Sequence, residues 1–152
     1  MVNPTEHPRA QSLEQPGAEP PDGPTVYYDG SCPLCSVEID HYASRDGAEK
    51  LRFVDVSHSD ADPGAGLNRT DAMARFHVRQ PDGKLLSGAR AFVAVWDTLP
   101  GWKWAARLAK IPGVTPVLEL AYRAFLPFRP FLARTLGKRL KAAQARGGSA
   151  SN

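Results

Sequence analysis

The chain has 152 residues, of which 42% are apolar, and carries a formal net charge of +3. This apolar fraction excludes a wholly disordered chain, and no run reaches the roughly 18 uncharged apolar residues that a membrane-spanning helix needs. The charge is unevenly distributed, because residues 1–101 hold 9 Lys and Arg against 15 Asp and Glu, whereas residues 102–152 hold 10 against 1.

The first 24 residues contain six prolines and no aromatic side chain. Such a segment cannot bury enough apolar surface to offset the entropy lost on ordering, so we expect residues 1–24 to form a disordered tail. The segment also lacks the basic start and the continuous apolar run of a signal peptide. We therefore expect a cytoplasmic protein.

Regular patterns begin at Thr25. Residues 25–28 predict a strand that ends in a turn at Asp29-Gly30, and a helix is predicted from Pro33 to about Ser44, with Ser31 as its N-cap. Apolar and polar residues alternate over residues 51–56, which predicts a second strand. A loop over residues 57–69 and a short helical turn over 70–73 follow.

The second half of the chain begins with a predicted hairpin, because residues 75–79 and 84–87 alternate around a Pro-Asp-Gly turn. Helices are predicted over residues 89–99, 102–110, 115–126 and 131–142, and residues 143–152 are predicted to be disordered. The order β-α-β-(α)-β-β-α joins a parallel strand pair to an antiparallel hairpin. We therefore predict an α/β fold with a thioredoxin-like small mixed sheet, in a domain spanning residues 25–142 that includes additional C-terminal helices.

The two cysteines of the chain, Cys32 and Cys35, stand together in the sequence DGSCPLC. Two thiols at this spacing at the start of a helix can cycle between dithiol and disulfide, and in a reducing compartment such a pair is usually catalytic. The helix N-terminus favours a thiolate, so we expect Cys32 to attack. Cys35 shares an apolar stripe with Ile39 and Tyr42, so we expect it to be the more buried thiol and to resolve the mixed disulfide.

Asp29 lies three residues before Cys32, and two roles are open for it. It could brace the turn or cap the helix, or it could accept a proton from a thiol as a general base. An ionised Asp29 close to Cys32 would raise the pKa of that thiol, which argues against simple activation. We expect Gly30 to supply a backbone geometry that other residues resist, and Pro33 to stiffen the loop.

Two other interpretations of the cysteine pair compete with redox chemistry. The cysteines could be ordinary core residues, or they could bind zinc with two further ligands drawn from His41, His58 and His77. None of these histidines forms a second close-spaced ligand pair. The sequence therefore favours a redox pair with neither metal nor cofactor.

The motif and several later segments resemble the DCC family of predicted thiol-disulfide oxidoreductases, named for an Asp-x-x-Cys-x-x-Cys signature that is here Asp29, Cys32 and Cys35. The segments LRFVDV, ARFHV, PDGKLLSGARAF, LPGW and VLELAYR resemble later blocks of the family in the same order, so the resemblance covers about residues 25–126. It implies a thioredoxin-like fold, Cys32 as nucleophile, Cys35 as resolving thiol and Asp29 as a site residue. The family's substrates are poorly defined.

One departure from thioredoxin itself is visible before the third strand, where thioredoxins place a cis-proline that faces the cysteines. The equivalent stretch here, residues 71–75, holds no proline, and we expect trans bonds because a cis bond at a non-proline residue is costly. Substrate handling must then differ. We expect Pro33, Met73, Ala74 or Arg75 to contact the substrate, and Arg75 is also a candidate to stabilise the Cys32 thiolate.

Two functions are consistent with the sequence. The first is an enzyme that exchanges disulfides with a protein or small-thiol substrate and draws on an electron donor, neither of which the sequence names. The alternative is a thioredoxin-like binding module in which residues 102–142 dock a partner or a membrane surface, because aromatic and basic residues interleave there. Ordinary helix packing accounts for these aromatics (Trp102, Trp104, Phe125, Phe128 and Phe131) as well, and we favour it. Nucleic-acid binding is not expected, since charge alone points to it.

Overall fold

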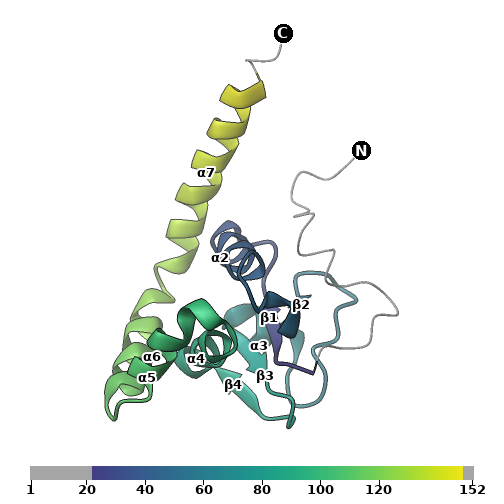
Figure 1. The fold of residues 1–152 in the computed structure, drawn as a ribbon. Helices are drawn as coiled ribbons and strands as arrows, with labels where there is room; N and C mark the ends of the chain where they lie inside the picture. The colour runs from purple at the N-terminus through teal and green to yellow at the C-terminus, as the bar shows by residue number, and fades with distance from the viewer. Residues whose placement is uncertain (1–21, 149–152) are drawn as a thin grey trace.

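A computed structural model describes residues 22–148, so all but the end of the tail predicted for residues 1–24 lies outside the described residues. Four strands form one mixed sheet in the order β2-β1-β3-β4 (Figure 1). β1 (Thr25–Tyr28) pairs parallel with β2 (Arg52–Asp55) and antiparallel with β3 (His77–Arg79), which pairs antiparallel with β4 (Leu85–Ser87). β1 therefore lies inside the sheet, and the residues that follow it emerge between two neighbouring strands.

Helices cover both faces of this sheet. On one face α2 (Pro33–Ala43) and α4 (Ala89–Thr98) share a core with Val26 and Phe53, and on the other α3 (Arg69–Ala74) packs with Tyr27 and Val56. The alternation of β1 side chains between the faces is what a strand imposes. Short 3₁₀ turns, η1 (Ala48–Lys50) and η2 (Pro100–Trp102), precede β2 and follow α4. The predicted element order and the thioredoxin-like mixed α/β fold are confirmed.

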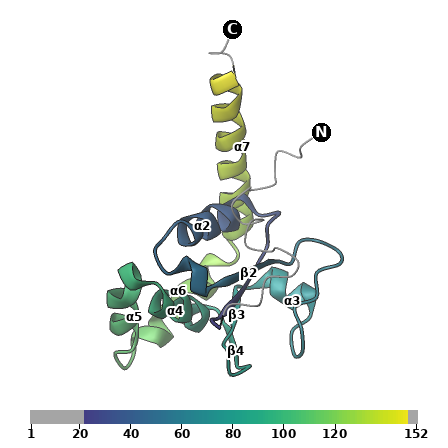
Figure 2. The same ribbon diagram turned by 45° about the vertical axis from the view of Figure 1, so that its right-hand side comes forward.

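Three further helices complete the described chain. α5 (Lys103–Ala109) and α6 (Val114–Phe125) pack against α4, and α7 (Arg129–Gly148) packs against α2. The far end of α7 projects away from the sheet (Figures 1 and 2). α7 begins earlier than predicted because Pro130 fits the first turn of a helix, where no backbone N–H is required. It also continues past residue 142, so residues 143–148, predicted to be disordered, are helical.

Glu119 of α6 ties the C-terminal helices to the hairpin and α4. One carboxylate oxygen accepts hydrogen bonds from Arg75 and Arg123, and the other accepts one from the backbone N–H of Ala89 at 3.0 Å. Because Gly88 gives α4 no side-chain cap, Glu119 supplies the missing acceptor at the start of that helix. Burial raises the pKa of Glu119, but the hydrogen bonds from Ala89, Arg75 and Arg123 lower it to about 2.

We predict that Glu119→Gln lowers the free energy of unfolding at pH 7 by about 1–3 kcal/mol, because charge-assisted hydrogen bonds are lost. The pKa of Glu119 in the folded protein, about 2, is below its ordinary value of 4.5. The stabilisation is therefore complete above about pH 4.5 and is lost as the pH falls toward 2. Urea denaturation at several pH values measures this, with Glu49→Gln at an exposed site as control. An equal deficit at pH 7 and pH 2.5 would contradict the role of the charge.

Candidate active site

The loop between β1 and α2 is held by hydrogen bonds to its backbone. The Gly30 N–H donates to Asp55 Oδ1 at 2.9 Å, the Ser36 hydroxyl donates to the Gly30 carbonyl at 3.1 Å, and the Cys32 N–H donates to the Asp29 carbonyl at 3.1 Å. A Cβ at Gly30 would lie 1.9 Å from Asp55 Oδ2. The expectation of an unusual backbone geometry at Gly30 is wrong, because its φ is not positive and the glycine serves this close approach instead.

Cys32 is the N-cap residue of α2 and Pro33 begins the helix, so the prediction of Ser31 as N-cap is wrong by one residue. Ser31 instead donates both its N–H and its hydroxyl to Asp29 Oδ1. Cys32 therefore lies at the positive end of the helix dipole, beside free backbone N–H groups. Both cysteines are free thiols.

The two thiols have opposite proton affinities. A hydrogen bond from the Cys35 thiol, with smaller contributions from the Cys35 backbone N–H and then from Arg129, lowers the pKa of Cys32 to about 5 even though burial acts in the raising direction. The same hydrogen bond, together with burial, raises the pKa of Cys35 far above its ordinary value. The pair therefore holds a thiolate at Cys32 and a proton at Cys35.

The prediction that Cys35 is the more buried residue is wrong in terms of accessible surface. Cys32 is 8% exposed, whereas Cys35 is half-buried and lines a pocket of about 470 Å³. This pocket lies mostly among apolar and aromatic side chains, including Ile39 and Phe92. The other two residues of the predicted apolar stripe, Ile39 and Tyr42, are buried in the core. Cys35 is the less buried end of that stripe.

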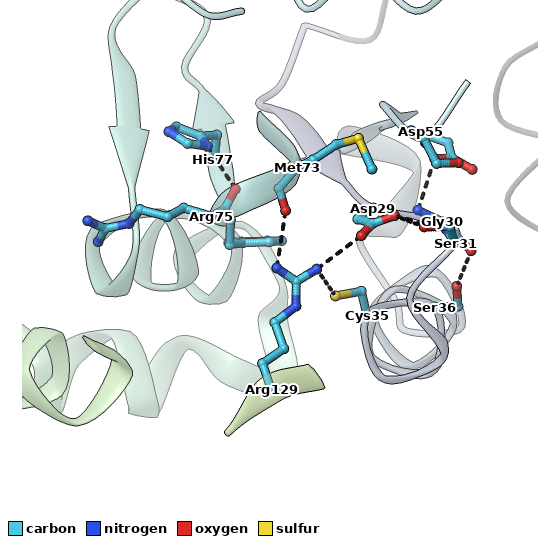
Figure 3. Close-up of polar contacts among 12 residues, drawn as sticks. Asp29, Gly30, Ser31, Cys35, Ser36, Asp55, Met73, Arg75, His77 and Arg129 are labelled. Atoms are coloured by element: carbon cyan, nitrogen blue, oxygen red, sulfur yellow. Dashed lines mark hydrogen bonds and ion pairs between the residues drawn. The ribbon is translucent and has the colours of Figure 1, made fainter. Parts of the chain in front are cut away.

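Arg129, at the start of α7, contacts the site from outside the cysteine motif. Its Nη2 lies 3.1 Å from Cys35 Sγ and 3.3 Å from Asp29 Oδ2, and its Nη1 donates to the Met73 carbonyl at 3.1 Å (Figure 3). The side chains of Arg129 and Asp29 are only 17% and 14% exposed. An arginine in this position supplies a permanent positive charge to the sulfurs, and the sequence reasoning did not find it.

Asp29 stabilises the turn that precedes α2. Its Oδ1 accepts hydrogen bonds from Ser31, and its Oδ2 binds Arg129. It does not cap α2, since the N-cap position has no side-chain hydrogen bond. Of the two roles open from the sequence, bracing the turn has direct contacts in the structure, and the proton-transfer role stays a prediction.

A second carboxyl, Glu38, lines the same pocket as Cys35 and lies one turn further along α2. It accepts a hydrogen bond from the Tyr42 hydroxyl at 2.9 Å, and that hydroxyl accepts one from Trp96 at 3.2 Å. Burial raises the pKa of Glu38, against opposing effects of the Tyr42 hydrogen bond and the Arg129 charge. Glu38 is therefore a second carboxyl on the pocket that Cys35 lines, and its position was not evident from the sequence.

The residues predicted to contact substrate are divided between two hollows. Met73 and Arg75 line the Cys35 pocket, whereas Pro33 and Ala74 line a second hollow beside Cys32, and their contact with substrate stays a prediction. Every peptide bond in residues 22–148 is trans, as expected for the stretch without proline. The hypothesis that Arg75 stabilises the Cys32 thiolate is wrong. The Arg75 guanidinium bonds Glu119 and lies over the Tyr122 ring, directed away from Cys35 (Figure 3).

The three histidines considered as zinc ligands have separate surroundings. His41 lies edge-on to Trp102, His58 contacts Asp55, and the His77 ring bonds the Arg75 carbonyl at 2.8 Å. Among residues 22–148, no three Cys, His, Asp or Glu side chains are grouped closely enough to hold a metal ion.

We predict that Arg129→Gln raises the pKa of Cys32 modestly above its value of about 5, because a neighbouring positive charge is lost while the larger contribution of the Cys35 thiol remains. The pH dependence of Cys32 alkylation by iodoacetamide, with the modified residue located by mass spectrometry, measures this value. Arg139→Gln removes an exposed charge from the same helix and serves as control. An alkylation profile identical to that of the unmodified protein would contradict the assignment.

Comparison with known proteins agrees with this geometry. The chain is 29% identical over 107 residues to an uncharacterized chloroplastic protein of Arabidopsis thaliana, covering 68% of this chain and 50% of that protein. The chain thus spans about half the length of the curated relative it matches. No solved structure matches it significantly. A family profile described as DCC1-like thiol-disulfide oxidoreductase matches residues 26–135, which extends past the predicted limit of 126 and includes Arg129. The chain therefore belongs to the DCC1-like thiol-disulfide oxidoreductase family.

Proposed function

We propose that Cys32 and Cys35 exchange disulfides with a protein or small-thiol substrate. The Cys32 thiolate attacks one sulfur of the substrate disulfide, which breaks that bond and releases one substrate thiolate. Cys35 then loses its proton and attacks Cys32, forming the Cys32–Cys35 disulfide and releasing the second substrate thiolate. Two electrons pass to the substrate, and an external thiol or dithiol returns the pair to its reduced form.

The observation that carries this proposal is the position of Cys32 at the start of α2, beside Cys35 and Arg129. Cys32 is at a helix N-terminus, bonded by the Cys35 thiol and influenced by Arg129, and its pKa of about 5 makes it a thiolate at neutral pH. Thiolate character is what makes a cysteine reactive in exchange. We propose a cytoplasmic setting, where a reducing environment would keep the pair as thiols.

Glu38 is the group we assign to take the proton of Cys35. Of the two carboxyls that line the pocket with Cys35, Asp29 already binds Ser31 and Arg129. Glu38 has an elevated proton affinity, which brings it closer to that of a thiol and suits proton transfer.

We predict that Cys32→Ser lowers insulin-disulfide reduction, with dithiothreitol as donor, to the uncatalysed rate, because no nucleophile remains. Cys35→Ser should instead accumulate a mixed disulfide on Cys32, which intact-mass measurement detects. Ser31→Ala, a change beside the nucleophile, is the control for local disturbance. Unchanged insulin reduction by Cys32→Ser would sink the proposal.

A second candidate function, docking to a membrane surface, is favoured by the exposed apolar residues of the C-terminal helices. The packing expected for the aromatics holds for Trp102, which stacks on Trp96 at 5.8 Å, but it is wrong for Trp104, Phe125, Phe128 and Phe131, which are exposed. Exposed large apolar side chains are frequent in and between the C-terminal helices: Trp104, Leu108, Ile111, Val117, Leu120, Phe128 and Phe131. Exposed apolar residues that gather in one patch usually mark a binding surface.

We propose that an acidic membrane surface covers these residues, because residues 102–152 hold 10 Lys and Arg against 1 acidic residue. Such binding would be peripheral. Within residues 22–148, no helix is both long and apolar enough to cross a bilayer.

We predict that the full chain floats with vesicles of acidic phospholipid at low salt, and less at high salt, because salt screens the basic residues. Leu120→Ser/Phe128→Ser should reduce flotation severalfold, whereas Leu140→Ser, at an exposed leucine further along α7, should not. Absence of binding to acidic vesicles at low salt would remove this function.

A further inference from the structure

The two cysteines of the motif line different hollows. Cys35 faces the mainly apolar pocket, whereas Cys32 lines a hollow of about 690 Å³ between the motif and α7, which we call the Cys32 groove. Pro33 and Ala74 form part of the groove on the motif side, and residues of α7 form the opposite wall. A disulfide that reaches Cys32 must therefore lie beside α7.

α7 is held close to the motif at two points along this groove. Arg129 anchors its first turn to Cys35 and Asp29, and Gly137 approaches Pro33 so closely that a Cβ on the glycine would lie 3.4 Å from the proline ring. The position of the groove wall relative to Cys32 is thus set by packing and by an ion pair. Side chains next to this packed face of α7 border the nucleophile.

Three cationic residues of α7 line the groove at positions i, i+4 and i+7, namely Arg134, Lys138 and Lys141. At 1.5 Å per residue they span about 10 Å along one side of the helix. The one carboxylate that lines the groove, Asp29, already binds Arg129, and no Asp or Glu follows Glu119 in the sequence. Among residues 22–148, none of the three forms an ion pair with a carboxylate.

We propose that the Cys32 groove selects disulfides that carry carboxylates near their sulfurs, with Arg134, Lys138 and Lys141 as the residues that recognise them. This inference rests on the exchange reaction proposed above and names its substrate class. Uncompensated cations beside a nucleophile raise the local concentration of anionic reactants and bond their carboxylates. The same cations stabilise the negative charge that develops on the departing substrate sulfur.

The test is a single-turnover reaction, which needs no electron donor. Reduced full-length protein is mixed with excess oxidised glutathione, hydroxyethyl disulfide or cystamine, which are anionic, neutral and cationic. Loss of the Cys32 thiol is followed by acid quenching and mass spectrometry. Each rate is divided by the rate of the same disulfide with 2-mercaptoethanol, to remove intrinsic reactivity. We expect normalised rates to fall in that order, with about a tenfold or larger spread that narrows at high salt.

A matched pair of variants assigns the effect to the groove. Arg134→Gln/Lys138→Gln/Lys141→Gln removes the three groove cations, and Arg107→Gln/Arg139→Gln/Arg146→Gln removes as many charges from exposed positions outside it. The groove variant should lose about fivefold or more of its rate with oxidised glutathione and little with hydroxyethyl disulfide. The control variant should keep the preference. A longer peptide disulfide with glutamates beside its cysteines distinguishes a small peptide substrate from an acidic protein segment.

Equal normalised rates for the three disulfides, or an equal loss in the control variant, would overturn the groove assignment while leaving the exchange reaction intact. A preference for the cationic disulfide would also overturn it. If the unmodified protein reacts with none of the three disulfides, the proposed exchange function fails, and the substrate class fails with it.

Discussion

The contact of Arg129 with the cysteine motif is the interaction on which the arrangement of the site depends. One guanidinium bonds Cys35 Sγ on α2, Asp29 at the end of β1 and the Met73 carbonyl in α3. Since arginine stays charged at any relevant pH, the site holds a fixed positive charge beside two titratable sulfurs. α7 therefore contributes a residue to the candidate site, although it is the last element of the described chain.

The pKa values of the two thiols differ because their surroundings differ. Cys32 is the N-cap residue of α2 and accepts a hydrogen bond from the Cys35 thiol, and both features favour its thiolate. Cys35 donates that hydrogen bond and is desolvated, which favours its protonated form. The two hollows that the cysteines line also differ in polarity. Cys32 lines the groove with cationic residues, and Cys35 lines a mainly apolar pocket that Glu38 also lines.

The family profile matches only part of the C-terminal helices. The matched region ends at residue 135 and so includes Arg129 and Arg134, whereas Lys138 and Lys141 lie outside it. The site's positive centre thus belongs to the matched region, and part of the charged groove wall does not. Glu119 joins these helices to the hairpin and to α4, which places α6 and the start of α7 relative to the sheet.

The sequence by itself determined the order of the elements along the chain, the mixed sheet and the position of both cysteines, because strand alternation, turn residues and the C-x-x-C spacing are local signals. The order of the strands within the sheet, β2-β1-β3-β4, came from the tertiary structure. It also indicated Asp29, which lies next to the motif. Arg129 could not be found this way, because it is 94 residues from Cys35 and nothing in the sequence separates it from the other basic residues of the last third. Arg75 is closer in sequence to the predicted site, yet its charge is bound by Glu119. Which arginine reaches the sulfurs was decided only by the packing of α7 on α2, since electrostatic contacts depend on distance in space and not along the chain.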